Sequence, residues 1–341
     1  SFTKKNGELY MTGIKKVASL AGVSIATVSR VINKNQNVSE EKRLRVQKVL
    51  DELKYEVNYH AKYLREMKTG MLLFIVTDIS NPFYAEIVKG AEEYAKSKNY
   101  NVLVCNGYFD RDIERKYFKF IENKLVDGAF IMDLAIEKEF LKDFSTKYSI
   151  IQCSEYYNDI GVPFVSIDHE KAAFEAVSSL LESGFEEIFF IQTKKDFVFD
   201  KLRLNGYMRA LEAHNIPFKE NLIVKTDFSY AGGINAAKVI LKNKIKKVGI
   251  FTVSDVIAVG IVNYLNYKKI NIPNDYSIIG FDDIELCKAV FPSITTIHQP
   301  RSKIGKEACK ILINKILKTE NSDTTHNKFL PHKLIKRGTT V

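Results

Sequence analysis

Between residues 25 and 33, short polar side chains and one arginine alternate with apolar residues at helical spacing. In a helix over residues 25–32, the inward positions would be Val28, Val31 and Ile32. The positions left to face outward would be Ala26, Thr27, Ser29, Arg30 and Asn33. Hydroxyl groups donate to phosphates or bases, an arginine pairs with guanine, and a small apolar side chain touches the thymine methyl group. This pattern favours a nucleic-acid-binding helix.

Two helices and a tight turn would position these side chains. Residues Ile14, Val17, Ala18 and Ala21 fall on one face of a first helix, and Gly22 supplies the residue that ends it. Ser24 can then cap the second helix. A third amphipathic helix follows from Glu40, with Ser39 as its expected N-cap. Two short helices joined by a glycine-containing turn are a helix-turn-helix unit, whose second helix enters the major groove.

The positive charge of the chain is concentrated in this region. The 341 residues carry a formal net charge of +10. Residues 1–70 hold 14 Lys and Arg against 7 Asp and Glu, and residues 71–341 hold 37 against 34. A small basic module before a nearly neutral large one indicates that the first part meets a polyanion and the second part meets something else.

The rest of the chain has the pattern of an α/β protein. Apolar runs such as MLLFIV, NVLVC, GAFIM, EIFFI, KVGIFT and SIIGF alternate with helical segments. This alternation predicts parallel sheets covered by helices on both faces. It repeats on either side of about residue 168, which predicts two lobes with a ligand cleft where the carboxyl ends of their strands converge.

Several other classes of protein are disfavoured by what the sequence lacks. It contains no G-x-G-x-x-G, G-x-x-x-x-G-K-[ST], H-E-x-x-H or G-x-S-x-G motif, so we expect no enzyme and no cofactor. The six histidines have no metal-ligand spacing, and no metal is expected. The four cysteines are expected to be buried free thiols. No apolar run of 18 residues and no signal peptide are present, which predicts a cytoplasmic protein with no membrane partner.

Several segments together resemble the LacI/GalR family of repressors. The headpiece resemblance rests on VASLAGVSIATVSRVIN (17–33), and further matches are ISNPFYAEIVKGAEE (79–93), RLNGYMRAL (203–211), VSDVIAVG (253–260) and SIIGFDDIEL (277–286). Within the family, the chain looks most similar to the ribose and cytidine repressors. The resemblance implies a headpiece over 12–57, a hinge over 58–69 and a periplasmic-binding-protein-like core over 70–341. Its first lobe would span about 70–168 and 298–326, and its second about 169–297 and 327–341.

The resemblance also assigns residues to DNA. It places near the groove Ser24, Ile25, Ala26, Thr27, Ser29, Arg30 and Asn33. Asn58 and Leu64 belong to the family's hinge, in which a leucine wedges into the central minor-groove step of a pseudo-palindromic operator bound by a homodimer. Three positions depart from the family's pattern. Gly13 and Lys16 replace the usual capping residues of the first helix, and Val57 replaces a hinge proline.

The same resemblance implies an effector site in the cleft. Its candidate residues are Asn81, Phe83, Tyr84, Glu155, Arg203, Phe228, Ser254, Asp282 and Gln299. The rings would stack on a sugar or base, and Arg203 with Asp282 would grip adjacent hydroxyl groups. Asp255 is expected to cap a helix rather than to meet the ligand.

Two hypotheses for function remain open. In the first, a pentose, another sugar or a nucleoside closes the lobes and releases the DNA. In the second, the core docks a phosphorylated protein partner as co-repressor, as catabolite-control members of the family do.

Overall fold

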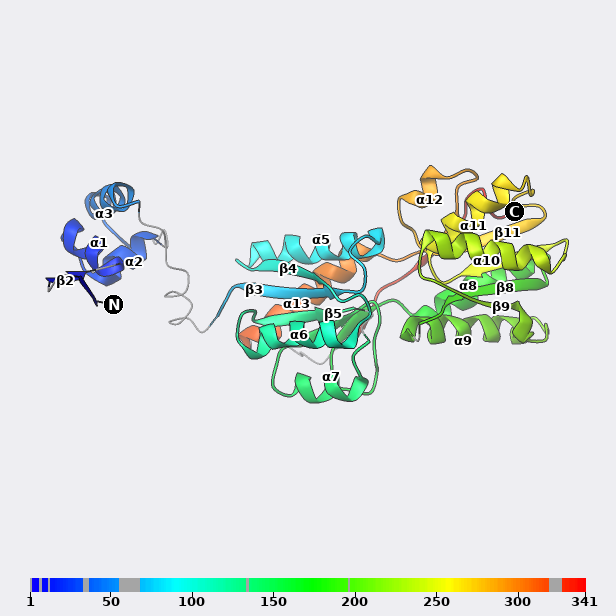
Figure 1. Cartoon of the computed structure of the whole chain (residues 1–341), viewed down its shortest axis with the longest axis horizontal. Coiled ribbons are helices and arrows are strands. Elements are labelled where there is room, and N and C mark those ends of the chain that lie inside the picture. The colour runs from blue at the N-terminus through cyan, green and yellow to red at the C-terminus, as the bar shows by residue number, and fades with distance from the viewer. Residues whose placement is uncertain are drawn as a thin grey trace. The chain divides into compact units, whose positions relative to one another are not determined.

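The structure is a computed structural model that describes residues 2–5, 8–11, 13–32, 37–54, 68–132, 135–195, 197–318 and 327–341. The chain divides into two compact units, Ser1–Lys68 and Thr69–Val341. Each unit is described by itself below, and both are drawn in Figure 1.

The first unit is a small helical bundle preceded by a two-stranded antiparallel ribbon. Its elements are β1 (Phe2–Lys5), β2 (Glu8–Met11), α1 (Ile14–Ala21), α2 (Ile25–Ile32) and α3 (Glu40–Glu52). Gly22 ends α1 in the left-handed conformation at φ 62°, which confirms the predicted turn. The buried apolar residues of the three helices form one cluster around Val17, Val28 and Val46. Ser39 precedes α3 as predicted, but its side chain makes no capping hydrogen bond.

The second unit contains two six-stranded sheets, one in each lobe. The first sheet has the order β13-β7-β6-β5-β3-β4 and is parallel throughout. Its strands are β3 (Met71–Val76), β4 (Asn101–Asn106), β5 (Gly128–Ile131), β6 (Ile150–Cys153), β7 (Phe164–Ser166) and β13 (Lys328–Phe329). The helices of this lobe are α5 (Pro82–Ser97), α6 (Arg111–Glu122), α7 (Lys138–Ser145) and α13 (Arg301–Leu317).

The second sheet has the order β14-β12-β11-β10-β8-β9, with the edge strand β14 antiparallel to β12. Its strands are β8 (Glu187–Thr193), β9 (Ile223–Thr226), β10 (Val248–Thr252), β11 (Tyr276–Asp282), β12 (Thr295–His298) and β14 (Lys333–Ile335). The helices of this lobe are α8 (His169–Glu182), α9 (Val198–Ala213), a 3-10 turn (Glu220–Leu222), α10 (Tyr230–Lys242), α11 (Asp255–Tyr267) and α12 (Leu286–Ala289).

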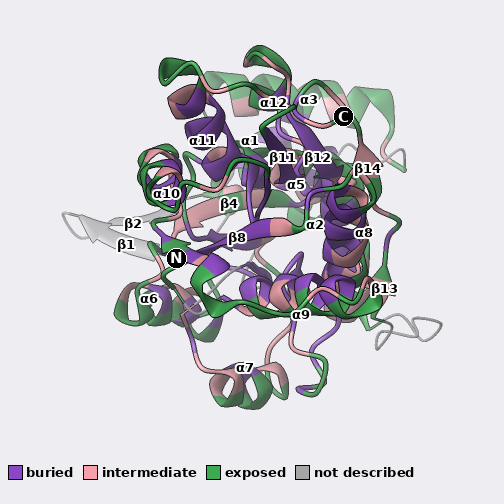
Figure 2. Ribbon diagram, turned by 90° about the vertical axis from the view of Figure 1, so that its right-hand side faces the viewer, coloured by how far each residue is buried: buried purple, intermediate pink, exposed green. Residues whose placement is uncertain are grey.

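The alternating apolar runs form these strands because both faces of each sheet are covered. β8 and β11 are buried along almost their whole length, whereas the surrounding helices turn exposed residues outward (Figure 2). This arrangement confirms the predicted α/β class with two lobes.

The chain crosses between the lobes three times, and all three crossings leave strands at the same edge of the sheets. They follow β7, β12 and β13, which lie at or next to the ends of the two strand orders. The last crossing falls after β13, because Lys328 and Phe329 pair with β7 of the first sheet. The predicted boundary at residue 327 was therefore several residues too early.

Candidate DNA-reading helix and interlobe pocket

Helix α2 presents the side chains predicted to contact DNA on its exposed face. Val28 and Val31 are buried, whereas Ser24, Ile25, Ala26 and Arg30 are exposed, and Thr27 and Ser29 are half-buried. The Ser24 hydroxyl caps the helix by accepting the backbone amide of Thr27 at 3.1 Å. The two hydroxyl groups of this pair also lie 2.9 Å apart. Since the cap fixes the first turn, the reading face is held in place before DNA is present.

Three predicted DNA contacts cannot be placed. Asn33, Asn58 and Leu64 lie outside the described residues. At the start of α1, Gly13 is the N-cap and makes no side-chain cap, as expected for a position where the family's capping residue is replaced. The hinge therefore remains a prediction from sequence.

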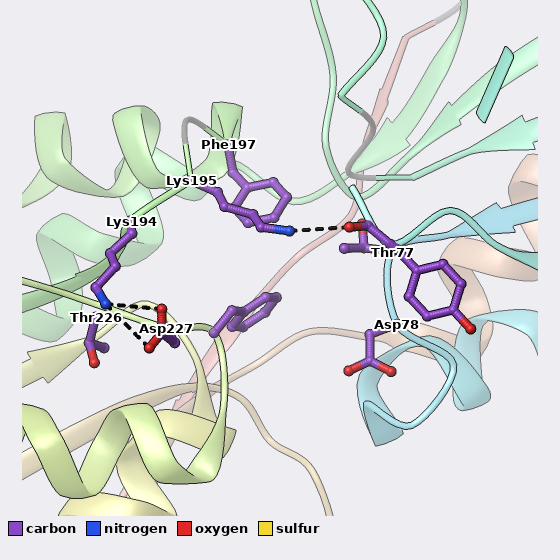
Figure 3. Close-up of a pocket in the computed structure, with 9 residues that line it drawn as sticks. Thr77, Asp78, Lys194, Lys195, Phe197, Thr226 and Asp227 are labelled. Carbon is purple, nitrogen blue, oxygen red and sulfur yellow. Dashed lines mark hydrogen bonds and ion pairs between the residues drawn. The ribbon is translucent and has the colours of Figure 1, made fainter. Parts of the chain in front are cut away.

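The two lobes enclose a pocket of about 290 Å³. It is lined by Thr77, Asp78, Tyr108, Lys194, Lys195, Phe197, Thr226, Asp227 and Phe228. Figure 3 shows Thr77 and Asp78 on one side, with Lys194, Thr226 and Asp227 on the other. Lys194 Nζ lies 3.1 Å from Asp227 Oδ1, so the rim carries an ion pair. Three rings and several charged groups thus surround a space large enough for a small metabolite.

The lining residues share one feature of sequence, which is their position directly after a strand. Thr77 follows β3, Tyr108 comes two residues after β4, Lys194 follows β8, and Asp227 follows β9. In each sheet the strand order reverses at the first strand, β3 or β8, because its neighbours on the two sides are the next two strands in sequence. Ligands bind at such switch points. The end of each apolar run in the sequence points to these residues, yet Phe228 is the one pocket residue among the sequence-predicted effector contacts.

Arg203 was predicted to face the cleft, but it does not line the pocket. Only 3% of it is exposed, and its guanidinium carbon lies 3.6 Å from the ring centroid of Phe281 and 4.6 Å from that of Phe199. Its Nη1 donates to the carbonyl of Val253, and Nη2 lies 3.3 Å from Nδ1 of His169. The arginine is therefore held between two rings inside the second lobe.

Asp282 belongs to the same buried region. Its Oδ1 accepts a hydrogen bond from Nε2 of Gln299 at 2.8 Å, and its Oδ2 accepts one from the hydroxyl of Ser254 at 3.2 Å. Burial raises the pKa of Asp282, and the neighbouring Arg203 guanidinium opposes this rise. The structure thus brings four predicted effector residues together, but as an internal network rather than as a lining of the pocket.

The expected cap at Asp255 is wrong. The N-cap of α11 is Ser254, whose hydroxyl accepts the amide of Val256 at 3.3 Å. The Asp255 carboxylate turns inward, where it accepts the hydroxyl of Thr296 at 2.7 Å and the amide of Ile284 at 3.0 Å. Burial raises the pKa of Asp255. Its role is to join α11 to β12 and to the loop after β11.

The predicted aromatic contacts in the first lobe also lie in the core. Asn81 is the N-cap of α5, and its Oδ1 accepts the amide of Phe83 at 3.0 Å. The rings of Phe83 and Tyr84 are 5% and 2% exposed, and they pack edge to face at 5.5 Å. Because α5 packs its apolar face on the sheet, neither ring lines the interlobe pocket.

Two buried groups connect the lobes near the pocket. Glu155, which follows β6, accepts the backbone amide of Val198 from the second lobe. His169 is not among the sequence-predicted site residues, and its Nε2 lies 2.8 Å from the carbonyl oxygen of Ser154. Burial lowers the pKa of His169, as does the nearby Arg203, so the ring is neutral. Its Nε2 then carries the proton, and its Nδ1 accepts from Arg203.

Glu114 of α6 is a fully buried carboxylate beneath the pocket loops. Its Oε2 accepts the amides of Ala135 at 2.9 Å and Ile136 at 3.1 Å, and its side chain packs against Gly107. These bonds join the segment that follows β5 to α6, and the packing on Gly107 brings α6 against the turn after β4. Burial raises the pKa of Glu114 to about 7, although the two amide hydrogen bonds oppose the rise.

This shifted group predicts a pH dependence of folding. Between pH 4.5 and 7, Glu114 binds more protons in the folded chain than in the unfolded one, so its contribution to the free energy of unfolding falls as pH rises. Glu114→Gln should remove on the order of 2 kcal/mol of that decline, as measured by urea unfolding of the core at several pH values. The exposed Glu122→Gln on the same helix is the control and should keep the wild-type slope. Equal slopes for the two variants would contradict the assignment.

Disulfides, metal-binding clusters and membrane-spanning helices are all absent from the residues that the structure describes. All four cysteines are free thiols; Cys153, Cys287 and Cys309 are buried as predicted, whereas Cys105 is half-buried. Within the described ranges, no group of three or more His, Cys, Asp and Glu side chains is placed to hold a metal ion. None of the helices that the structure describes is long and apolar enough to span a bilayer.

Comparison with known proteins identifies both parts of the chain. Residues 13–58 match the bacterial regulatory proteins of the lacI family, and residues 177–340 match the periplasmic binding protein-like domain. A helix-turn-helix unit followed by such a core defines a DNA-binding transcription regulator. The chain is 34% identical to catabolite control protein A of Priestia megaterium, covering 96% of this chain and 98% of that protein. It therefore belongs to the LacI family.

Other relatives agree with this assignment. The transcriptional repressor PurR of Vibrio atlanticus is 33% identical over 97% of this chain and 99% of its own length. The solved lac repressor dimer bound to operator shares the fold with a TM-score of 0.86 at 22% identity, covering 97% of this chain and all of that one. A regulator from Enterococcus faecium with bound ribose has a TM-score of 0.71 at 27% identity, covering 79% and 98%. These relatives establish the family without favouring its ribose and cytidine repressors.

Proposed function

We propose that this protein is a repressor that binds a pseudo-palindromic operator as a homodimer and releases it when a small sugar or nucleoside occupies the interlobe pocket. The observation that carries the proposal is the pocket itself, which is lined by both lobes and combines rings with charged rims. A ligand held there touches both lobes and can therefore bias their arrangement. Linkage then requires that operator and effector alter each other's affinity by the same factor.

The chemistry of the pocket supports a polyhydroxylated ligand with a ring. Phe197 and Phe228 offer faces on which a sugar or base can stack. The carboxylates of Asp78 and Asp227 accept hydrogen bonds from hydroxyl groups, and the ammonium of Lys194 donates them. Because the Arg203–Asp282 region is internal, we expect it to stabilise the fold of the second lobe without contacting the ligand.

Calorimetry with a pentose, hexose and nucleoside panel tests the effector. We expect one compound to bind wild-type protein and to weaken its operator affinity, and Asp78→Asn with Asp227→Asn to lose that compound while still binding operator. If no compound binds, the proposed effector class is wrong.

The protein-partner hypothesis is supported by a different surface. Lys303, Lys306 and Lys310 are all exposed, and their spacing places them along one side of α13. Such a row of ammonium groups suits a phosphorylated protein. Binding of a phosphocarrier protein that strengthens operator binding, without any response to the small-molecule panel, would favour this second function.

Self-association is supported by apolar groups on the surface of the first lobe. Ile79 is 61% exposed, and it borders a shallow hollow that Tyr84, Val88 and Val104 also line. A single headpiece contacts too few base pairs for a unique genomic site, so two are needed. We therefore expect a homodimer and a footprint with dyad symmetry.

The reading face of α2 predicts a specific defect in DNA recognition. Arg30→Ala should weaken binding to the selected operator by roughly 1–3 kcal/mol and relax sequence preference, because its exposed guanidinium is suited to a base edge. Thr27→Ala should act in the same direction and more weakly, because its hydroxyl is already paired with Ser24. Fluorescence anisotropy on operator and scrambled duplexes measures both.

A matched arginine outside α2 provides the control. Arg45 is exposed on α3, so Arg45→Ala should lower the salt dependence of binding yet keep the ratio of operator to scrambled affinity. An Arg30→Ala protein with an unchanged ratio would refute the assignment of α2 as the reading helix.

A further inference from the structure

The loop between β8 and α9 in the second lobe is held by two loops of the first lobe. Lys195 Nζ donates to the carbonyl of Tyr108 at 3.2 Å, and the same ammonium lies 4.9 Å from the ring centroid of Phe109. Phe197 packs on Phe109 with ring centroids 4.3 Å apart. The backbone amide of Val198 donates to the carboxylate of Glu155. Residues 195, 197 and 198 therefore each contact the first lobe.

The contacts of Lys195 and Phe197 with residues 108 and 109 lie far from the crossovers that connect the lobes, whereas Glu155 follows β6, next to the crossover strand β7. The crossovers leave β7, β12 and β13, whereas Phe109 follows β4 and Lys195 follows β8. β4 is the opposite edge strand of the first sheet, and β8 is next to the opposite edge of the second. Two bodies hinged at one edge open most at the other edge. Contacts at that other edge therefore have the greatest leverage on lobe opening.

The first-lobe turn that makes these contacts has an unusual backbone. Tyr108 and Phe109 both have positive φ, at 58° and 53°, and the amide of Asp110 donates to the carbonyl of Gly107 at 3.0 Å. Two successive left-handed residues in such a turn normally include glycine or asparagine. Aromatic residues adopt this conformation at a cost in free energy that surrounding contacts must offset. The contacts with Lys195 and Phe197 are such contacts.

The same side chains also form part of the pocket wall. Tyr108, Lys195 and Phe197 all line the pocket, so a molecule bound there touches the groups that join the lobes. Phe197 further contacts Phe199 at 4.9 Å and Phe228 at 5.8 Å. Through Phe199, this ring cluster reaches the guanidinium of Arg203. The interlobe contacts are therefore continuous with the buried network of the second lobe.

We propose that Tyr108, Phe109, Glu155, Lys195, Phe197 and Val198 form an interlobe latch that holds the core closed without an effector. The effector then acts on lobes that are already in contact. This regulatory consequence rests on the proposed function, whereas the latch itself is a property of the core and is tested without DNA.

The test measures the distance between the lobes in the effector-free full-length chain. Spin labels are placed at Lys119→Cys on α6 and Asn205→Cys on α9, both exposed, after Cys105→Ser removes the half-buried thiol. For the doubly labelled parent protein, pulsed electron–electron double resonance should give one narrow distribution of distances between the two labels. Phe109→Asn, which tolerates positive φ but lacks the ring, should add a longer-distance population, and Lys195→Met should do the same.

Tyr108→Asn is the matched control, because it has the same backbone requirement and contributes only its carbonyl to the latch. It should keep the narrow distribution. A broad distribution in the parent, or latch variants that match the control, would overturn the proposal. If Phe109→Asn fails to fold by circular dichroism, Lys195→Met decides the outcome. If the protein binds operator but the distance distributions show no latch, the latch is refuted and the proposed function stands. If the distributions show the latch but the protein binds no operator, the proposed function alone is refuted.

Discussion

Replacing Arg203 with Met should lower the free energy of unfolding of the core by about 2–4 kcal/mol. The guanidinium is 3% exposed and is held by the Phe281 and Phe199 rings and by the Val253 carbonyl. Methionine fills part of the volume, but it leaves the Val253 carbonyl without this donor and removes the charge that favours ionisation of Asp282. Urea unfolding followed by circular dichroism gives the free energy.

Arg209→Met on the same helix is the control for this substitution. Arg209 is largely exposed and pairs with Glu170 at 2.5 Å, so its loss should cost less than about 1 kcal/mol. Combining Arg203→Met with Asp282→Asn should cost less than the sum of the two single changes, because the two side chains interact. A stability loss at Arg203 no greater than at Arg209 would show that the buried arrangement is wrong.

This expectation changes how the effector hypothesis must be tested. If Arg203 and Asp282 gripped the hydroxyl groups of the effector, as the sequence predicts, substitution of either would remove ligand binding alone. Because both are structural, a variant at either position can lose the response through weakened folding. The pocket residues Asp78 and Asp227 are therefore the sharper probes of ligand binding.

Replacing Gly305 with Leu should destabilise the first lobe by about 3 kcal/mol or more. Helices α5 and α13 cross so closely that a β-carbon at Gly305 would overlap the carbonyl oxygen of Ile87. Gly90 on α5 faces the backbone of Ser302 in the same way. The clash is with backbone atoms, so a rotamer change cannot relieve it and the helices must separate. Chemical denaturation measures the loss.

Lys306→Leu, one residue further along α13, separates this clash from the general effect of a leucine. Lys306 is exposed, so the substitution should change stability by less than about 0.5 kcal/mol. If Gly305→Leu were as stable as Lys306→Leu, the two helices could not be packed as closely as the structure places them.

Local sequence determined much of this protein. The helical spacing of apolar residues such as Val17, Val28 and Val31 predicted the headpiece helices, because the buried face of an amphipathic helix is visible in the spacing of its own apolar residues. Gly22 marked the turn, since a left-handed residue favours glycine. The alternation of apolar runs with helical segments predicted two sheets, because strands buried on both faces are apolar throughout. The cleft at the carboxyl ends of the strands followed from that topology.

The tertiary structure alone decided which of those end residues face the cleft. Sequence placed Arg203 and Asp282 near the cleft, but their direction depends on Phe281, which is 78 positions from Arg203 in the chain. Likewise, Lys195 meets the Tyr108 carbonyl across 87 positions. No periodicity within one helix or strand encodes such contacts. They arise when elements distant in the chain pack together, within the second lobe for Arg203 and between the lobes for Lys195. The packing of rings and carbonyls at these places determines which polar groups are buried and which line the pocket.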